Sequence, residues 1–123
     1  YVCILFEVKK NDKTILNYIF KRGFDFIEKQ NLKARKKIFQ NIRRAERQSD
    51  PKLFKKLTND IWEFRTLYSG TQYRLLAFWD KENKSETLVL ATHGIVKKTS
   101  KVDQKEIDKA KKNRTLYFKN KKR

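Results

Sequence analysis

Six charged or titratable residues stand inside otherwise apolar segments in the second half of this 123-residue chain: Glu63, Arg65, Arg74, His93, Lys97 and Lys98. Side chains two residues apart point to the same face of a strand, so Glu63 and Arg65 share a face in the segment IWEFR. The same spacing puts His93 and Lys97 on one face, and Lys98 points the other way unless the strand has ended. If the segments are neighbouring strands, these side chains can converge on one sheet face.

The balance of charge suggests what such a face binds. Cations outnumber the single carboxylate, Glu63, by at least three. Like charges that face one another destabilise a sheet unless an anion binds between them, and phosphate is the obvious anion. The structural alternative is a cross-strand ion pair of Glu63 with Arg65 or Arg74. His93 taken alone fits equally well a buried histidine that hydrogen-bonds a backbone carbonyl.

Other chemistries find no matching motif. The chain has one His and one Cys, and its carboxylates do not follow EF-hand or paired spacing, so we expect no metal ion. The glycine-rich motifs of nucleotide sites and the GxSxG elbow of serine hydrolases are not found in the sequence. We therefore expect no cofactor, and any hydrolytic chemistry has to proceed without a metal.

The net charge points to nucleic acid. The chain carries 32 Lys and Arg against 14 Asp and Glu, a net charge of +18. Residues 28–48 hold eight basic and two acidic residues (+6), and residues 97–123 hold twelve and three (+9). Two solvated helical faces are the alternative interpretation. The candidate RNA contacts are Arg43, Arg44, Lys112, Arg114 and Tyr117. Tyr117 fits stacking on RNA or packing on the sheet, and the sequence leaves both open.

The pattern of apolar residues predicts one α+β domain. Residues 1–8 and 14–20 read as a strand hairpin, with a helix over 12–21 as the competing interpretation. Helices are predicted at 24–30 and 32–48, the second capped by Asn31. Strands are predicted at 61–65, 73–79 and 87–96, followed by a helix at 103–113. Residues 115–123 are expected to be a basic tail, loosest from Lys119 onward.

The location follows from what the sequence lacks. With a single cysteine, Cys3, the chain cannot form an internal disulfide, which is typical of a cytoplasmic protein. Its longest apolar run is too short to cross a bilayer, and no segment combines a wide apolar face with a basic one. We expect a cytoplasmic protein that does not associate with membranes.

Several motifs in order resemble a known superfamily. The runs FKKLTNDIWEFRTLYSGTQYRLLAFWDK, LVLATHGIVKKTSK and EIDKAKKN are similar to the RelE/HigB toxins, closest to the phage-derived HigB-like branch. The resemblance covers residues 53–114, and residues 24–42 resemble the family's helical hairpin less specifically. Residues 1–13 have no counterpart and are expected to be an N-terminal extension. Ile95 replaces the usual Phe, and Val102-Asp103 replaces a frequent Thr-Pro.

The resemblance implies a RelE-like fold, with a helical hairpin packed on a twisted, mainly antiparallel sheet and a C-terminal helix. It implies the toxin of a type II toxin–antitoxin system, an endoribonuclease that cleaves mRNA, usually on the ribosome. A cognate antitoxin, expected to be of the helix-turn-helix type, neutralises such a toxin. By the same resemblance, Arg74 lies at the scissile phosphate, Glu63 and Arg65 match the family's E-L-R strand, and His93, Lys97 and Lys98 match its HGFxKK segment.

Metal-free RNA cleavage sets clear demands on these residues. The substrate's own 2′-hydroxyl attacks the phosphate, so the protein must accept a proton, stabilise a phosphorane and protonate the leaving oxygen. Arg74 suits the phosphorane because its planar guanidinium grips two oxygens. Glu63 or His93 can act as base, and His93 or a lysine as acid. The alternatives are a ParE-like inhibitor of DNA gyrase, which has the same fold, and a non-catalytic RNA-binding module.

Overall fold

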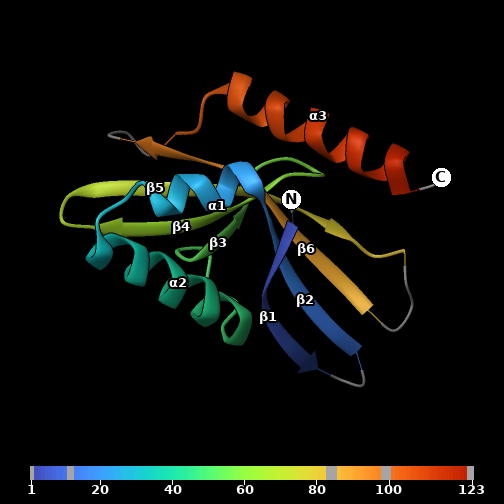
Figure 1. Cartoon of the computed structure of the whole chain (residues 1–123), viewed down its shortest axis with the longest axis horizontal. Coiled ribbons are helices and arrows are strands. Elements are labelled where there is room, and N and C mark those ends of the chain that lie inside the picture. The colour runs from blue at the N-terminus through green and yellow to red at the C-terminus, as the bar shows by residue number, and fades with distance from the viewer. Residues whose placement is uncertain (1, 11–12, 83–85, 98–100, 122–123) are drawn as a thin grey trace.

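The computed structural model describes residues 2–10, 13–82, 86–97 and 101–121. Helices and strands are mixed along the chain: β1 (Val2–Lys10), β2 (Lys13–Phe20), α1 (Lys21–Glu28), α2 (Leu32–Arg47), β3 (Phe54–Lys56), β4 (Trp62–Tyr68), β5 (Thr71–Asp80), β6 (Glu86–Lys97) and α3 (Gln104–Lys121). The strands form one sheet in the order β1-β2-β6-β5-β4-β3 (Figure 1). Among the strands of the described residues, only β2 and β6 pair in parallel, which confirms the α+β class and the mainly antiparallel sheet.

Most predicted elements are confirmed, with two corrections. The first strands form a hairpin, not the competing helix, and the Asn31 side chain accepts a hydrogen bond from the Ala34 amide at 2.9 Å to cap α2. The short strand β3 was not predicted. The tail expected from residue 115 is wrong as far as Lys121, because α3 continues to that residue. Its apolar residues Tyr117 and Phe118 pack on the sheet, and such tertiary contacts extend a helix beyond its own propensity.

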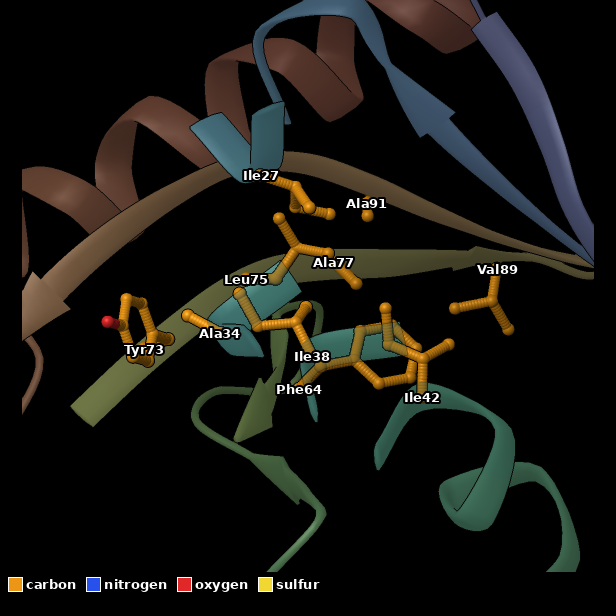
Figure 2. Close-up of a cluster of buried hydrophobic side chains, with 10 residues drawn as sticks. All are labelled: Ile27, Ala34, Ile38, Ile42, Phe64, Tyr73, Leu75, Ala77, Val89 and Ala91. Atoms are coloured by element: carbon orange, nitrogen blue, oxygen red, sulfur yellow. The ribbon is translucent and has the colours of Figure 1, made fainter. Parts of the chain in front are cut away.

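The sheet is covered on both faces. Side chains of α1 and α2 pack on one face in the cluster Ile27, Ala34, Ile38, Ile42, Phe64, Tyr73, Leu75, Ala77, Val89 and Ala91 (Figure 2). Helix α3 packs on the other face in the cluster Ile61, Leu76, Phe78, Leu90, Val102, Ile107 and Ala110. Strand β5 alternates between the two, which explains its nearly continuous apolar sequence. Among the described residues, none of the helices combines the length and apolar character that a membrane span needs.

A β-bulge in β6 separates the buried part of the sheet from its charged end. Leu75 pairs with Gly94 and Ala77 with Ala91, so two residues of β6, Thr92 and His93, lie opposite the single residue between them on β5. The extra residue changes the register beyond this point. Gly94 then lies under α1, where an added Cβ atom would overlap the ring of Phe26. A glycine is therefore required for α1 to approach this closely.

Replacing Gly94 with Ala should destabilise the fold, because the added methyl overlaps the ring of Phe26. We expect the free energy of unfolding in urea to fall by about 1–3 kcal/mol. The double variant Gly94→Ala/Phe26→Ala should be less destabilised than the sum of the two single variants, since removing the ring removes the overlap. Strict additivity would show that α1 does not lie against this glycine.

Candidate functional site

A buried ion pair joins β4 and β5. Arg74 Nε lies 2.7 Å from Glu63 Oε1, and each side chain is only 3% exposed. The Nε–H bond does not point at the carboxylate, so the contact is an ion pair without a hydrogen bond. The Arg74 Nη2 group donates instead to the side-chain oxygen of Gln72. Cross-strand ion pairing, the structural alternative raised by the sequence, is thus present in the molecule.

Burial dominates the electrostatics of the pair. It raises the pKa of Glu63, against the opposing charges of Arg74, Arg65 and Lys55. It also lowers the pKa of Arg74, since the attraction of Glu63 only partly offsets the loss of water and Arg65 repels it. The pair is therefore held by the surrounding fold more than by its own attraction. A carboxylate whose pKa is raised by burial accepts a proton more readily than a carboxylate in water.

Arg65 lies beside the pair as the cross-strand partner of Arg74. Its Nη1 donates to the Pro51 carbonyl at 3.2 Å. Its Nε, like that of Arg74, is buried and has no hydrogen-bond acceptor within the described part of the chain. Buried donors without acceptors are rare in native proteins and call for an explanation. Two of them on neighbouring arginines are suited to the oxygens of an anion.

His93 points to the α3 side of the sheet. Its Nδ1 lies 2.9 Å from the Thr92 hydroxyl, and its buried Nε2 is 3.8 Å from Glu106 Oε1. Burial lowers the pKa of His93; Glu106 opposes this shift, whereas Lys109 and Arg22 add to it. The imidazole is therefore neutral near pH 7, with one ring nitrogen left without a hydrogen bond within the described residues.

Lys97 completes the described part of the predicted face. Its ammonium lies 3.4 Å from Asp103 Oδ1, in the segment that leads into α3. Lys98 lies outside the described residues. The structure thus brings Glu63, Arg65 and Arg74 together, while His93 and Lys97 contact acidic residues of α3 and the segment before it. The predicted convergence on one sheet face is therefore found for Glu63, Arg65 and Arg74. His93 and Lys97 do not join them, because each contacts an acidic residue in or just before α3.

The far end of α3 is fixed by a carboxylate that the sequence interpretation missed. Asp80 is 1% exposed and accepts hydrogen bonds from Tyr117 Oη at 2.7 Å and Lys121 Nζ at 2.6 Å. Burial alone would raise the pKa of Asp80, but bonds from Lys121, the Glu82 amide and Tyr117 together lower it. The position of Asp80 directly after an apolar strand was the only signal in the sequence.

The predicted RNA contacts do not form one surface. Arg43 and Arg44 are exposed on α2, whereas Lys112 is exposed on α3, across the sheet. Arg114 Nη2 lies 3.8 Å from Asp60, and Tyr117 packs on the sheet, the second of the two placements that the sequence left open. Within the described ranges, no three His, Cys, Asp or Glu side chains lie close enough together to hold a metal ion.

Comparison with known proteins gives one match. The family model described as Phage derived protein Gp49-like (DUF891) matches residues 25–115, which include the second half of α1, all of α2, the strands β3 to β6 and most of α3. No curated protein and no solved structure matches the chain. Strand β1 and strand β2 lie before the matched region, although both belong to the sheet.

Removing one partner of the buried pair should cost more than removing both. Arg74→Ala leaves a carboxylate buried without its cation, so we expect the free energy of unfolding near pH 7.5 to fall by about 3 kcal/mol or more. Part of the loss should return at lower pH, where Glu63 becomes protonated. Glu63→Gln/Arg74→Gln should be closer to the wild type, because no charge is buried. Equal urea midpoints for wild type and Arg74→Ala would show that the pair is not buried in solution.

His93 should make the fold sensitive to mild acid. Its pKa is lowered in the folded state, so the unfolded chain binds a proton at higher pH than the folded chain does. This contribution to stability is complete above the ordinary pKa of 6.5 and declines as the pH falls through it. Between about pH 7.5 and about pH 5.5, the urea midpoint should fall further for wild type than for His93→Gln. An equal fall of the urea midpoint in the two proteins would show that His93 does not cause the sensitivity to acid.

Proposed function

Because this chain belongs to the phage derived Gp49-like family of toxin-like proteins of toxin–antitoxin systems, we propose that it is a type II toxin that cleaves mRNA without a metal ion. In this proposal it is an endoribonuclease of the RelE/HigB kind that acts on the ribosome in the cytoplasm. A helix-turn-helix antitoxin neutralises it. Its RNA contacts include Arg43, Arg44, Lys112, Arg114 and Tyr117.

The observation that supports cleavage most directly is the pair of buried donors on Arg65 and Arg74. Within the described residues neither Nε makes a hydrogen bond, although Arg74 Nε lies 2.7 Å from Glu63 Oε1, and the two arginines are cross-strand neighbours. A phosphate that replaces the Glu63 carboxylate at Arg74 satisfies both donors at once. Replacement is favourable because burial already opposes the charged form of Glu63. Guanidinium groups also bind phosphate through two parallel hydrogen bonds.

The same exchange supplies the base. Glu63 leaves the guanidinium while it stays next to the phosphate, where it accepts the proton of the 2′-hydroxyl. The 2′-oxygen then bonds to phosphorus, Arg65 and Arg74 stabilise the phosphorane, and the bond from phosphorus to the 5′-oxygen breaks. Lys97 or Lys98 gives a proton to that oxygen. The products are a 2′,3′-cyclic phosphate and a 5′-hydroxyl.

The lowered pKa of His93 favours a role in accepting or positioning a proton over a role in donating one. Its pKa is lowered, so it carries no ionisable proton to give near pH 7. Its Nε2 faces Glu106, which reaches it from α3. In this proposal α3 has to shift before Lys97 and His93 can contact the substrate. RNA that binds on the α3 side can drive such a shift if it makes more contacts with the shifted state of α3 than with the state seen here.

Arg74→Lys should separate catalysis from folding. Lysine keeps a positive charge near Glu63 but cannot form two parallel bonds to a phosphate, so cleavage should fall by about a hundredfold. Growth inhibition should be lost while the thermal unfolding midpoint stays close to that of the wild type. Lys36→Ala, an exposed change on α2, serves as the control and should remain toxic.

A substrate control tests the chemistry itself. An mRNA with a 2′-deoxy sugar on the 5′ side of the scissile phosphate should resist cleavage on a programmed ribosome. Cleavage of this substrate would show that water attacks, which contradicts the mechanism. If neither RNA is cut and DNA supercoiling is inhibited, the gyrase-inhibitor alternative replaces this proposal. RNA binding without cleavage would favour a binding module.

A further inference from the structure

The side chain of Arg74 has a second partner in addition to Glu63. Its Nη2 group donates a hydrogen bond to Gln72 Oε1. Glu63 is the cross-strand partner of Leu76, two residues after Arg74. Gln72 stands two residues before Arg74, on the same face of the strand. The guanidinium is therefore contacted from both directions along β5, by a carboxylate on one side and by a neutral amide on the other.

A tight turn sets the position of this glutamine. Ser69 and Gly70 connect β4 to β5, and their φ angles of 52° and 77° are both positive. Two-residue turns of this kind match the twist of the strands that they join, and the turn type fixes the register of the hairpin. The register places Gln72 opposite Leu67, directly beyond Arg74 on the same face of the sheet.

The neighbours of Gln72 leave its amide oxygen to Arg74. On β4 the cross-strand neighbour is Leu67, which is 64% exposed and has no hydrogen-bonding group in its side chain. On β6 the neighbour is Lys97, whose ammonium lies 3.4 Å from Asp103 Oδ1. In the described part of the chain, the bond from Arg74 is the only hydrogen bond of the Gln72 side chain. The amide oxygen is therefore available to Arg74 without competition from these neighbours.

A neutral partner affects Arg74 differently from a carboxylate. Glu63 compensates the positive charge, and in the proposed function it has to leave the guanidinium before a phosphate can bind there. Gln72 fixes the direction of the guanidinium without compensating its charge, so the full attraction for an anion remains. The Nη2 group carries two protons, so it can keep its bond to Gln72 and also donate to a phosphate oxygen.

We propose that Gln72 is a positioning residue, which holds the Arg74 guanidinium in place while a phosphate replaces the Glu63 carboxylate. This inference rests on the proposed function, since it concerns the same exchange. Without Gln72, the guanidinium keeps no hydrogen bond to the described residues once Glu63 leaves, and Arg65 beside it repels it. A flexible side chain then has to be ordered during the reaction, so cleavage slows although RNA still binds.

Two substitutions separate the hydrogen bond from the charge. Gln72→Met keeps the approximate length of the side chain but removes the acceptor, so kcat should fall about tenfold or more while KM changes by less than about twofold. Gln72→Glu keeps the acceptor but adds a negative charge next to the phosphate, so KM should rise about tenfold. Gln40→Met makes the same change as Gln72→Met on the exposed surface of α2 and should behave as the wild type. Cleavage by Gln72→Met at the wild-type rate would overturn the proposal.

The restraint on Arg74 can also be measured in the full chain without RNA. In the wild type, the bond to Gln72 should slow the rotation of the Arg74 Nη groups, which nuclear magnetic resonance detects. In Gln72→Met this rotation should approach that of the exposed Arg44. Equal rotation in the two proteins would overturn the proposal, and so would fast rotation in the wild type alone if Gln72→Met does not fold.

The two measurements distinguish this proposal from the proposed function. If Gln72 restrains Arg74 but the wild-type chain cleaves no RNA, the proposed function fails and the holding of Arg74 by Gln72 stands. If the wild type cleaves RNA and Gln72→Met cleaves it equally well, the proposed function stands and the positioning role of Gln72 fails.

Discussion

The ion pair between Glu63 and Arg74 is the constraint on which the functional side of this fold depends. Two charged side chains lie almost fully buried on neighbouring strands, and burial opposes the charged form of each. Such a pair is costly when either partner is removed and contributes little when both are kept. Its retention in a chain of 123 residues therefore calls for a role other than stability. In the function we propose, exchange of Glu63 for a phosphate at Arg74 provides that role.

In the same proposal, helix α3 determines when this exchange can take place. It crosses the sheet face that carries the pair and has polar contacts near both ends: Lys97 with Asp103 at the start, and Asp80 with Tyr117 and Lys121 at the end. Between them it packs through an apolar cluster of modest size. Glu106 of α3 faces His93, Asp103 directly before the helix pairs with Lys97, and basic side chains of α3 such as Lys112 are exposed. In the proposed function, RNA that binds these basic side chains couples substrate binding to release of the helix.

Much of the fold could be predicted because its signals are local. The alternation in β4 and the cap at Asn31 are each set by a few adjacent residues. The length of α3 could not be predicted, since the contacts of Tyr117 with the sheet span many positions in the chain. The β3 strand was missed because three residues give no detectable period.

The candidate site also combines features that neighbouring residues determine with features that depend on contacts between distant segments. Spacing alone placed Glu63 and Arg65 on one face, and register brought Arg74 beside them. The bulge at Thr92 and His93 is a property of pairing between strands and leaves no motif in the sequence. The partner of Asp80 lies on a helix 37 residues away, so its burial was also invisible. The excess of basic residues predicted a binding site for an anion. It did not predict that the Glu63 carboxylate itself lies against Arg74.

Nuclear magnetic resonance of the arginine Nε–H groups tests the central claim most directly. The labelled chain would be titrated with a short RNA that carries a 2′-O-methyl group at the scissile position and so resists cleavage. If phosphate replaces Glu63, the Nε–H signals of Arg65 and Arg74 should shift together and become protected from exchange with water. Shifts confined to the arginines of α2 and α3, with those of Arg65 and Arg74 unchanged at saturation, would contradict the account.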